Sequence, residues 1–491
     1  MPPPFFRRLT FLLTFHLTIL NPSFPPASAS PSDFSIIDYD AASDLFHRDY
    51  SPPTPPAPPH PPPLSCEDLK GIGSLNTTCQ LNYSLNFTND IYVPGDGNLF
   101  ILQGVVLACP SSGCSIVVNI TGEFRLNPSA KIVAGSVYIE AGNATLFTGS
   151  VINSTALGGE PSIITGTPTE AQGAGGGYGG RGASCVMDNK KLPEDVWGGD
   201  AYGWDWLMEP WSYGSKGGTT SKEDDYGGKG GGRIWIQVKD SVDVSGVLLA
   251  DGGDGGTKGG GGSGGSIYVK TRKMSGSGRI SASGGNGFAG GGGGRVSVNA
   301  FSRHDDPTLL VHGGRSFGCP TNAGAAGTFY DAVPRRLMIN NQNMSTDTDT
   351  LLLAFPNQPL WTNVYILNRA RATVPLLWSR IYGALRMSVK IYLMLNSKML
   401  INGDGDAIVA TSLLEASNLV VLKGSSMIHS NANLGVHGQG SLNLTGPGDL
   451  IEAQHLVLSL FYSISVRILI IIAFFWEAVT KLVSCVYSSM V

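Results

Sequence analysis

The sequence predicts an all-β protein, a β-helix-like parallel β-solenoid with glycine-rich corners. Three observations lead to this prediction. A short strand pattern recurs after each glycine run, a second strand pattern recurs between the first ones, and no long helical apolar period occurs except near the C-terminus. An array of β-sandwiches is the alternative architecture.

The first pattern places a glycine run directly before a short alternating strand. Ile234, Ile267, Val296 and Phe329 hold equivalent places in these strands, and the steps between them are 33, 29 and 33 residues. A near-constant step of this size is typical of stacked repeats, in which each repeat forms one rung. A collagen-like rod is excluded, because the glycines keep no Gly-X-Y register.

The second pattern lies between these strands, where residues 246–250 match residues 278–282. We expect alternate strand residues to face inward and to stack on the next rung. These residues are Ile234, Ile236, Val238, Ile267, Val269, Val296 and Val298. Glycine is expected at the corners, where the chain turns with positive φ and neighbouring backbones lie close together.

Composition limits the possible classes of protein. Apolar residues make up 42% of the 491 residues, which is enough to bury a core. Charged residues make up only 14%, whereas about 25% is usual in soluble domains. The formal charge of −4 and the lack of a basic stripe along the chain argue against nucleic acid as a partner.

The N-terminus has the pattern of a secretory signal peptide. Arg7 and Arg8 precede an apolar stretch, and Ala27-Ser28-Ala29 fits a cleavage site. A proline-dominated stretch at residues 51–63 follows, and we expect it to be an extended spacer.

These boundaries and the strand patterns divide the chain into seven segments. They are a signal peptide (1–29), a proline-rich linker (30–64), an N-terminal β-rich region (65–185), a tryptophan-rich insertion (186–226), glycine-rich solenoid repeats (227–332), a C-terminal β-solenoid region (333–462) and an apolar tail (463–491).

Glycosylation sequons also predict secretion. Eight asparagines are followed by the required Ser or Thr, namely Asn76, Asn82, Asn86, Asn119, Asn143, Asn153, Asn343 and Asn443. Together with the signal peptide they place the protein in the secretory pathway, with the extracellular space, the cell wall or the plasma membrane as its destination.

The cysteines fit the same compartment. Six of the seven are disulfide candidates, namely Cys66, Cys79, Cys109, Cys114, Cys185 and Cys319. They could form up to three bridges, with 15 possible pairings. Cys109 and Cys114 flank a Pro-Ser-Ser-Gly turn and form the first pairing we favour, and Cys66 with Cys79 is the second.

The insertion at residues 186–226 is unusually aromatic. Flat aromatic faces can stack on sugar rings, so a carbohydrate platform is one interpretation of this density. The preferred interpretation is the packing alternative, in which the rings pack the insertion onto the flank of the solenoid. The residues concerned are Trp197, Tyr202, Trp204, Trp206 and Trp211.

No catalytic residues, metal site or cofactor are predicted. Acid/base hydrolysis of a glycoside needs two carboxyls across the scissile bond, whereas adjacent Asp305 and Asp306 beside His304 would point in opposite directions on a strand. His312 and His437 only loosely match the histidine-bearing turn of β-helical polysaccharide hydrolases. The protein is therefore expected not to be an enzyme.

Two glycine-aspartate stretches invite a calcium interpretation. Residues 402–406 begin like a calcium loop, but Ala407 stands where glycine is needed and Leu413 where the bidentate glutamate belongs. Asp251 and Asp254 match a calcium-binding glycine repeat only vaguely. Ordinary turn chemistry is the preferred interpretation of both stretches.

The C-terminal residues 456–476 are mostly apolar, with Arg467 among them. A central arginine costs roughly 2.5 to 3.5 kcal/mol on insertion scales, which the many apolar residues could offset. The sequence leaves two alternatives open, a membrane-spanning helix and an amphipathic or aberrant tail.

Several long phrases resemble a family of large plant glycine-rich proteins that are secretory and membrane-anchored, with no characterised biochemical role. The phrases are residues 33–40, 191–202, 259–270, 301–307 and 430–449. The resemblance covers residues 33–462, loses a block at Arg380 and Ile381, and stops after Tyr462, so the chain looks like a truncated member. It implies a plant cell-surface location and supplies no catalytic residues.

We therefore expect a non-enzymatic extracytoplasmic scaffold or recognition protein of the plant cell surface or wall. The alternative is a carbohydrate-binding or carbohydrate-active solenoid centred on the tryptophan-rich insertion. The expected partner is a cell-wall polysaccharide or another surface protein, and membrane association would depend on the C-terminal tail.

Overall fold

The computed structural model describes residues 60–168, 172–185, 198–203, 207–352, 362–375, 384–402, 411–431, 433–438, 440–453, 455–459 and 463–466. The signal peptide and nearly all of the proline-rich linker lie outside these residues. Within them the chain forms strands β1 to β31 and one 3-10 turn, Ile164–Gly166, with no α-helix. The prediction of an all-β protein is confirmed.

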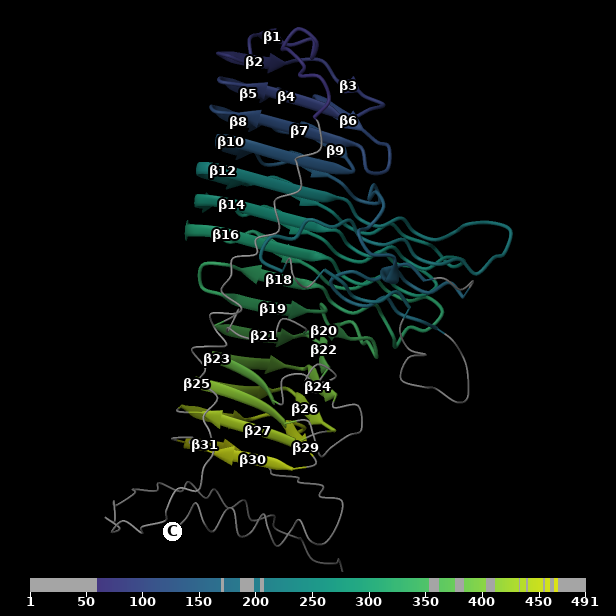
Figure 1. Ribbon diagram of the computed structural model, residues 1–491, viewed down its shortest axis with the longest axis vertical. Helices are drawn as coiled ribbons and strands as arrows, with labels where there is room; N and C mark the ends of the chain where they lie inside the picture. The colour runs from purple at the N-terminus through teal and green to yellow at the C-terminus, as the bar shows by residue number, and fades with distance from the viewer. Residues whose placement is uncertain are drawn as a thin grey trace, which may run out of the picture. The chain divides into compact units, whose positions relative to one another are not determined.

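The largest sheet contains 19 strands, which stack as successive rungs (Figure 1). They are β1 (Ile72–Gly73), β2 (Thr78–Leu81), β4 (Ile91–Gly95), β5 (Asn98–Ile101), β7 (Ser115–Ile120), β8 (Glu123–Leu126), β10 (Ser136–Leu146), β12 (Arg233–Val244), β14 (Ser266–Ser275), β16 (Arg295–Arg303), β18 (Thr328–Asp331), β19 (Arg336–Asn340), β21 (Asn363–Leu367), β23 (Ala384–Leu395), β25 (Thr411–Lys423), β27 (Asn433–Gly438), β28 (Ser441–Leu444), β30 (Leu456–Ser459) and β31 (Ser463–Val466).

Two smaller sheets are entirely parallel. The seven-stranded sheet contains β3 (Leu85–Asn86), β6 (Val106–Cys109), β9 (Lys131–Ala134), β11 (Val151–Asn153), β13 (Val247–Leu249), β15 (Arg279–Ser281) and β17 (Thr308–Leu310). The five-stranded sheet contains β20 (Thr350–Leu351), β22 (Arg371–Pro375), β24 (Lys398–Asn402), β26 (Met427–Ser430) and β29 (Leu450–Ala453).

The strand register agrees with the repeats in the sequence. Ile234 pairs with Ile267, Ile267 with Val296 and Val296 with Phe329, all in parallel strands. The second pattern also forms parallel strands, because β13 pairs with β15. The chain is therefore a parallel β-solenoid, in which each repeat in this region forms one rung, and the sandwich alternative is wrong.

Long strands bend at a corner and so supply two faces of a rung. The first half of β10 pairs with β7 and its second half with β8. The register between β10 and β12 shifts between Ala141 and Asn143, and that between β12 and β14 shifts between Gln237 and Ser241. A bulge of this kind bends a strand, so the two halves and a strand of the seven-stranded sheet enclose one interior.

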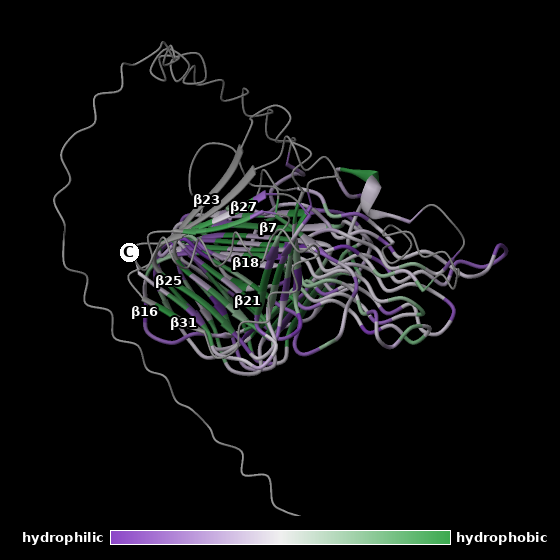
Figure 2. Ribbon diagram, turned by 90° about the horizontal axis from the view of Figure 1, so that it is seen from below, coloured by the Kyte–Doolittle hydropathy of each residue, from purple (hydrophilic) through white to green (hydrophobic). Residues whose placement is uncertain are grey.

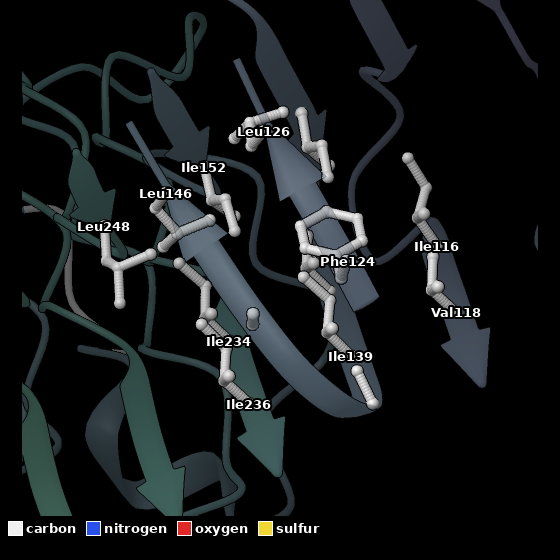
Figure 3. Close-up of a cluster of buried hydrophobic side chains, with 14 of the residues drawn as sticks. Ile116, Val118, Phe124, Leu126, Ile139, Leu146, Ile152, Ile234, Ile236 and Leu248 are labelled. Atoms are coloured by element: carbon white, nitrogen blue, oxygen red, sulfur yellow. The ribbon is translucent and has the colours of Figure 1, made fainter. Parts of the chain in front are cut away.

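The interior is filled by the residues that the alternation predicts. Ile234, Ile236, Val238, Ile267, Val269, Val296 and Val298 are at most 2% exposed. Figure 3 shows Ile116, Ile139, Ile234 and their neighbours directed into the same space from successive strands. Figure 2 shows these strands as predominantly apolar, whereas the glycine-rich loops beside them are neither strongly apolar nor polar.

At the N-terminal end β1 and β2 pair antiparallel, and farther along the stack the described strands break the parallel pairing at the β18–β19 hairpin. These two strands are antiparallel, and Phe329 belongs to one apolar cluster while Tyr330 belongs to the next. Asp331, only 3% exposed, joins the hairpin to β16 because it accepts hydrogen bonds from Arg303 (2.8 Å) and Arg336 (3.0 Å). Burial raises the pKa of the Asp331 carboxyl despite these two guanidinium groups. No feature of the sequence predicted this interruption.

The glycine runs do not turn the chain in the predicted way. Between residues 227 and 327, only Gly256 and Gly276 have positive φ, so the expectation of positive-φ corners is wrong for most of these glycines. They lie instead in extended segments packed side by side, which we call the glycine bundle: residues 173–183, 214–232, 250–265, 282–294 and 311–327. These segments run beside the strands from β12 to β18 (Figure 1).

Hydrogen bonds in the glycine bundle follow a period of three residues. Successive backbone N–H groups of residues 259–265 donate in turn to three different stretches of chain. Gly259, Gly262 and Gly265 donate to residues 250–255, the earlier part of the same segment. Gly260 and Ser263 donate to residues 215–218, and Gly261 and Gly264 donate to residues 289–292. A helix with three residues per turn and no internal hydrogen bonds has the geometry of polyproline II. Each segment can therefore bond to neighbours on three sides.

Close approach is the reason for glycine in this bundle. A Cβ atom on Gly262 would overlap the carbonyl oxygen of Lys229, and one on Gly260 would overlap that of Ala174. This part of the prediction, that backbones lie close together at the glycines, is confirmed. The C-terminal rungs use positive φ at their corners instead, mostly on non-glycine residues: Asn343, Asn368, Asn396, Gly424 and Ser425.

The solenoid continues past Tyr462. Ser463–Val466 forms β31, which pairs with β28, so the first residues of the predicted apolar tail belong to a rung. Residues 467–491, including Arg467 and Cys485, lie outside the described part of the chain. Among the described residues, no helix is long and apolar enough to cross a membrane.

Candidate functional site

Three aromatic residues form a ladder on the outer face of the largest sheet. The register places Tyr138 of β10 beside Trp235 of β12, and Trp235 beside Tyr268 of β14. The ring centroids of Tyr138 and Trp235 are 6.2 Å apart at 14°, and those of Trp235 and Tyr268 are 4.2 Å apart at 49°. Stacked rungs thus convert single aromatic residues, far apart in sequence, into one surface feature.

The end of the tryptophan-rich insertion packs on this ladder. The Trp211 ring meets those of Tyr138 and Trp235 edge-on, at 6.4 and 5.4 Å between centroids. The Arg233 guanidinium lies over the rings of Trp211 (4.0 Å) and Tyr213 (4.3 Å). Burial lowers the pKa of Arg233, while Tyr213 and Asp90 favour its charged form.

The aromatic residues of the insertion differ in their access to solvent. Tyr202 is 4% exposed and its hydroxyl donates to the carbonyl of Tyr213 (2.7 Å), so its ring cannot stack on a sugar. Trp211 is half-buried against the ladder. Both positions agree with the packing alternative. Trp197, Trp204 and Trp206 lie outside the described residues.

Tyr138 and Trp235 keep part of their surfaces exposed. The Tyr138 hydroxyl donates to Glu140 (3.2 Å), and Gln237 donates to the same carboxylate (3.5 Å). Burial and the Glu140 charge raise the pKa of Tyr138 to about 12, so the hydroxyl remains a donor at neutral pH. Tyr268 is fully buried, so the accessible part of the ladder is Tyr138 and Trp235. These two rings combine apolar faces with polar groups, which is the composition of a sugar-binding surface.

A polar hollow of 610 Å³ lies next to the insertion. It is lined by Thr88, Asn89, Asp90, Ser111, Ser112, Gly113, Cys114, Gly159, Glu160 and Tyr213. Asp90 accepts a hydrogen bond from the N–H of Ser115 (2.9 Å), and the Tyr213 hydroxyl donates to the carbonyl of Gly113 (3.3 Å). Sequence reasoning missed this hollow because its residues come from four separate segments.

The residues considered for hydrolysis are not brought together. His304, Asp305 and Asp306 lie in the exposed turn after β16, where Asp306 accepts a hydrogen bond from Arg303 (3.4 Å). His312 lines a different hollow, of 470 Å³, with Arg315. The His437 side chain lies outside what the structure describes. Nothing in this arrangement sets two carboxyls across a common substrate position.

The aspartates of the glycine repeat bind groups of the next rung, about 30 residues away in sequence, rather than groups of their own turn. Asp251 accepts hydrogen bonds from the Ser281 hydroxyl (2.5 Å) and the Ser283 N–H (2.7 Å), and Asp254 accepts one from the Asn286 N–H (2.7 Å). Among the described residues, no group of three or more His, Cys, Asp or Glu side chains could hold a metal. Residues 403–410, which include most of the other calcium-like stretch, lie outside them.

Three disulfides are formed. The two pairings favoured from the sequence, Cys66–Cys79 and Cys109–Cys114, are both present. The third joins Cys185 to Cys319 and so links the end of one bundle segment, residues 173–183, to another, residues 311–327. Three disulfides indicate an oxidising, extracytoplasmic environment.

None of the eight sequon asparagines belongs to the core. Five are exposed, namely Asn76, Asn82, Asn86, Asn119 and Asn343, and the other three, Asn143, Asn153 and Asn443, are half-buried. Of the half-buried group, Asn143 accepts a hydrogen bond from the Ser241 hydroxyl (2.7 Å), and Asn153 accepts one from the Thr155 N–H (2.9 Å). The surface of the solenoid can thus carry glycans without disturbing the interior.

Comparison with known proteins gave no assignment: no family model, curated protein or solved structure matches this chain. The resemblance to plant glycine-rich proteins therefore remains a prediction from the sequence phrases.

Proposed function

We propose that this chain is a non-enzymatic scaffold or recognition protein of the plant cell surface or wall. One observation carries the proposal: a disulfide-bonded solenoid keeps all eight sequon asparagines out of its core. A protein that acquires glycans and disulfides during secretion needs this arrangement. The resemblance to plant glycine-rich secretory proteins supports the plant surface as its location.

The solenoid architecture supports a scaffold or recognition role. Each rung contacts its neighbours and adds one strip of outward-facing side chains to a continuous surface. Such a surface can bind an extended partner through many weak contacts, with little ordering cost in the protein. The expected partners are a wall polysaccharide or another surface protein.

Localisation of a tagged full chain tests the proposal. We expect the protein in the extracellular or wall fraction, with an endoglycosidase-sensitive mass and blocked thiols for Cys66, Cys79, Cys109, Cys114, Cys185 and Cys319. A version ending at Val466 keeps β31 and should show whether the apolar residues beyond it retain the protein on membranes. A cytosolic protein with free thiols and no glycans would contradict the proposal.

Carbohydrate binding is the second candidate function, and two features favour it: the half-exposed rings of Tyr138 and Trp235, and the polar hollow lined by Glu160. A glycan array with the secreted chain should then show neutral oligosaccharide binding. Tyr138→Ala and Glu160→Gln should each weaken it by about tenfold, since one ring contact and one hydrogen bond to a charged group are each worth about 1.4 kcal/mol. Tyr83→Ala is the control, because Tyr83 is 63% exposed on another rung. Equal binding by all variants would refute this candidate.

A further inference from the structure

We propose that one corner of the solenoid binds a polysaccharide that carries carboxylates, such as a polyuronate. The site is the basic corner, defined as Lys239 of β12, Lys270, Arg272 and Lys273 of β14, and Phe301 of β16. The inference rests on the proposed extracytoplasmic recognition function and specifies the partner of that surface. The basic corner is separate from the aromatic ladder and from the polar hollow.

The strand register brings the four cations together. Gln237 pairs with Lys270 and Ser241 pairs with Lys273, so Lys239, in the bulge of β12, faces the stretch from Lys270 to Lys273. Neighbouring strands are about 4.8 Å apart. Lys270, Arg272 and Lys273 lie within four residues of one another, and stacking adds Lys239, which precedes Lys270 by about one repeat.

The four cations are exposed, and none forms a salt bridge with any residue that the structure describes. Arg303, on the next rung, differs because it binds Asp331 (2.8 Å) and Asp306 (3.4 Å). Like charges on adjacent strands repel one another. An unneutralised group of cations at one corner therefore favours an external anion.

Five carboxylates lie on these strands, on the neighbouring β10 or in the turn after β16, and three of them already accept hydrogen bonds from protein groups. Asp240 is exposed within the same bulge. Glu140 accepts hydrogen bonds from Tyr138 and Gln237, and Asp243 accepts them from Ser245 (2.6 Å) and Ser275 (2.9 Å). The turn after β16 adds the exposed Asp305 and the Arg303-bound Asp306. Together β12 and β14 carry these four exposed cations and a single exposed carboxylate, so the corner is locally positive on a chain of formal charge −4.

Phe301 adds an apolar contact to the charge. It is 77% exposed, and the pairs Thr271 with Ala300 and Lys273 with Ser302 place it opposite Arg272. An aromatic face can pack on the apolar face of a sugar ring, while a guanidinium binds a carboxylate through two parallel hydrogen bonds. A ring beside a guanidinium fits a uronate residue better than a neutral sugar or an isolated anion.

An extended polyanion is the appropriate occupant, because the cations cover two adjacent strands. Nucleic acid is also a polyanion, but it would require basic groups tracking many phosphates, and here the four cations occupy one corner. The disulfides further indicate an extracytoplasmic environment, where acidic polysaccharides are available partners.

Titration of the secreted full chain with polygalacturonate, at low and at high salt, tests this inference. We expect binding that weakens as salt rises, and a loss of at least about tenfold in Lys270→Gln/Arg272→Gln/Lys273→Gln, since attraction between exposed charges is screened. Phe301→Ala should weaken binding without changing its salt dependence. The control Lys131→Gln/Lys398→Gln/Lys423→Gln removes three exposed cations from other rungs and should bind like the parent.

Three results would overturn the inference: equal loss in the control variant, equal binding of a neutral glucan, or tighter binding of an oligonucleotide. Thermal unfolding of every variant shows whether lost binding reflects lost folding, and the surface-only Phe301→Ala keeps the test decisive if the triple variant unfolds. A secreted, glycosylated protein that ignores polygalacturonate refutes this inference alone. A chain that is never secreted refutes the proposed function, whatever it binds in vitro.

Discussion

Glycine residues of the bundle are needed for the space that they leave rather than for unusual backbone angles. Gly262 illustrates this, because a Cβ would overlap the Lys229 carbonyl while its own φ is not positive. Gly256 represents the opposite case, with φ of +65° and nothing within 4 Å of its Cβ position. The same residue type therefore meets two different requirements in one stretch of chain.

Alanine substitution at these two glycines should separate the two requirements. Gly262→Ala must push packed backbones apart, and we expect a loss of at least about 3 kcal/mol in the free energy of unfolding. Gly256→Ala should cost only about 1 kcal/mol, the price of a left-handed conformation. Chemical denaturation of both secreted variants measures the difference. Equal losses would show that backbone angle, not space, explains the glycines.

Asp331 is the residue that fixes the β18–β19 interruption. Asp331→Ala should cost about 3 kcal/mol, because Arg303 and Arg336 would lose their shared carboxylate in a half-buried place. Asp306→Ala should cost less than about 1 kcal/mol, because the Asp306 side chain is 66% exposed. Thermal unfolding of the two variants checks the prediction. A harmless Asp331→Ala would mean that apolar packing alone holds the hairpin.

At the scale of elements, two kinds of secondary structure lie side by side. The strands bury alternate residues, so a period of two predicts them, whereas the bundle segments bond to three neighbours with a period of three. The second kind has no apolar face to bury. The Cys185–Cys319 disulfide therefore helps to hold the bundle segments together, and the packing of Trp211 on Trp235 of β12 attaches the insertion to the strands.

Removal of single disulfides should show how much the Cys185–Cys319 bridge contributes to the free energy of unfolding. The Cys185–Cys319 loop spans 134 residues and the Cys109–Cys114 loop spans 5. Loop-closure entropy predicts losses of about 5 and about 2 kcal/mol when each is replaced by a pair of serines. Denaturant unfolding of the two variants measures both losses. If the free energy of unfolding fell more on loss of Cys109–Cys114, the bundle segments would stay together without the Cys185–Cys319 bridge.

At the scale of the whole molecule, stacking creates surfaces from residues that are distant in sequence. The aromatic ladder joins positions about 100 residues apart, since Tyr138 and Trp235 flank the entire insertion. The basic corner arises in the same way. In a solenoid, residues at equivalent positions of successive repeats thus become neighbours in space.

Glycan occupancy is a prediction at this scale. We expect modification at Asn76, Asn82, Asn86, Asn119 and Asn343, where a glycan extends directly into solvent. Asn143 and Asn153 should remain unmodified, because their amide oxygens accept hydrogen bonds within the rungs. Enzymatic removal of the glycans in oxygen-18-labelled water converts each occupied asparagine into a mass-labelled aspartate. Peptide mass mapping then measures the occupancy of each site. Full occupancy at Asn143 would contradict this view of the surface.

Much of the fold could be predicted because its signals are local. The inward set from Ile234 to Val298 follows from alternation, and the rung spacing follows from the glycine-led repeats. The Cys109–Cys114 bridge follows from a short turn. The candidate sites could not be predicted as readily, because the polar hollow and the basic corner each combine segments that only stacking brings together.

The sequence by itself determined the all-β class, the rung step and the inward-facing strand residues from Ile234 to Val298, since these depend on periodicity along the chain. Only the tertiary structure decided that the glycine runs form a bundle with a period of three, because that depends on which backbones lie within hydrogen-bonding distance. It also decided the antiparallel break at Phe329 and the burial of Tyr202. In each of these cases the cause is a contact between segments that are separate in the chain.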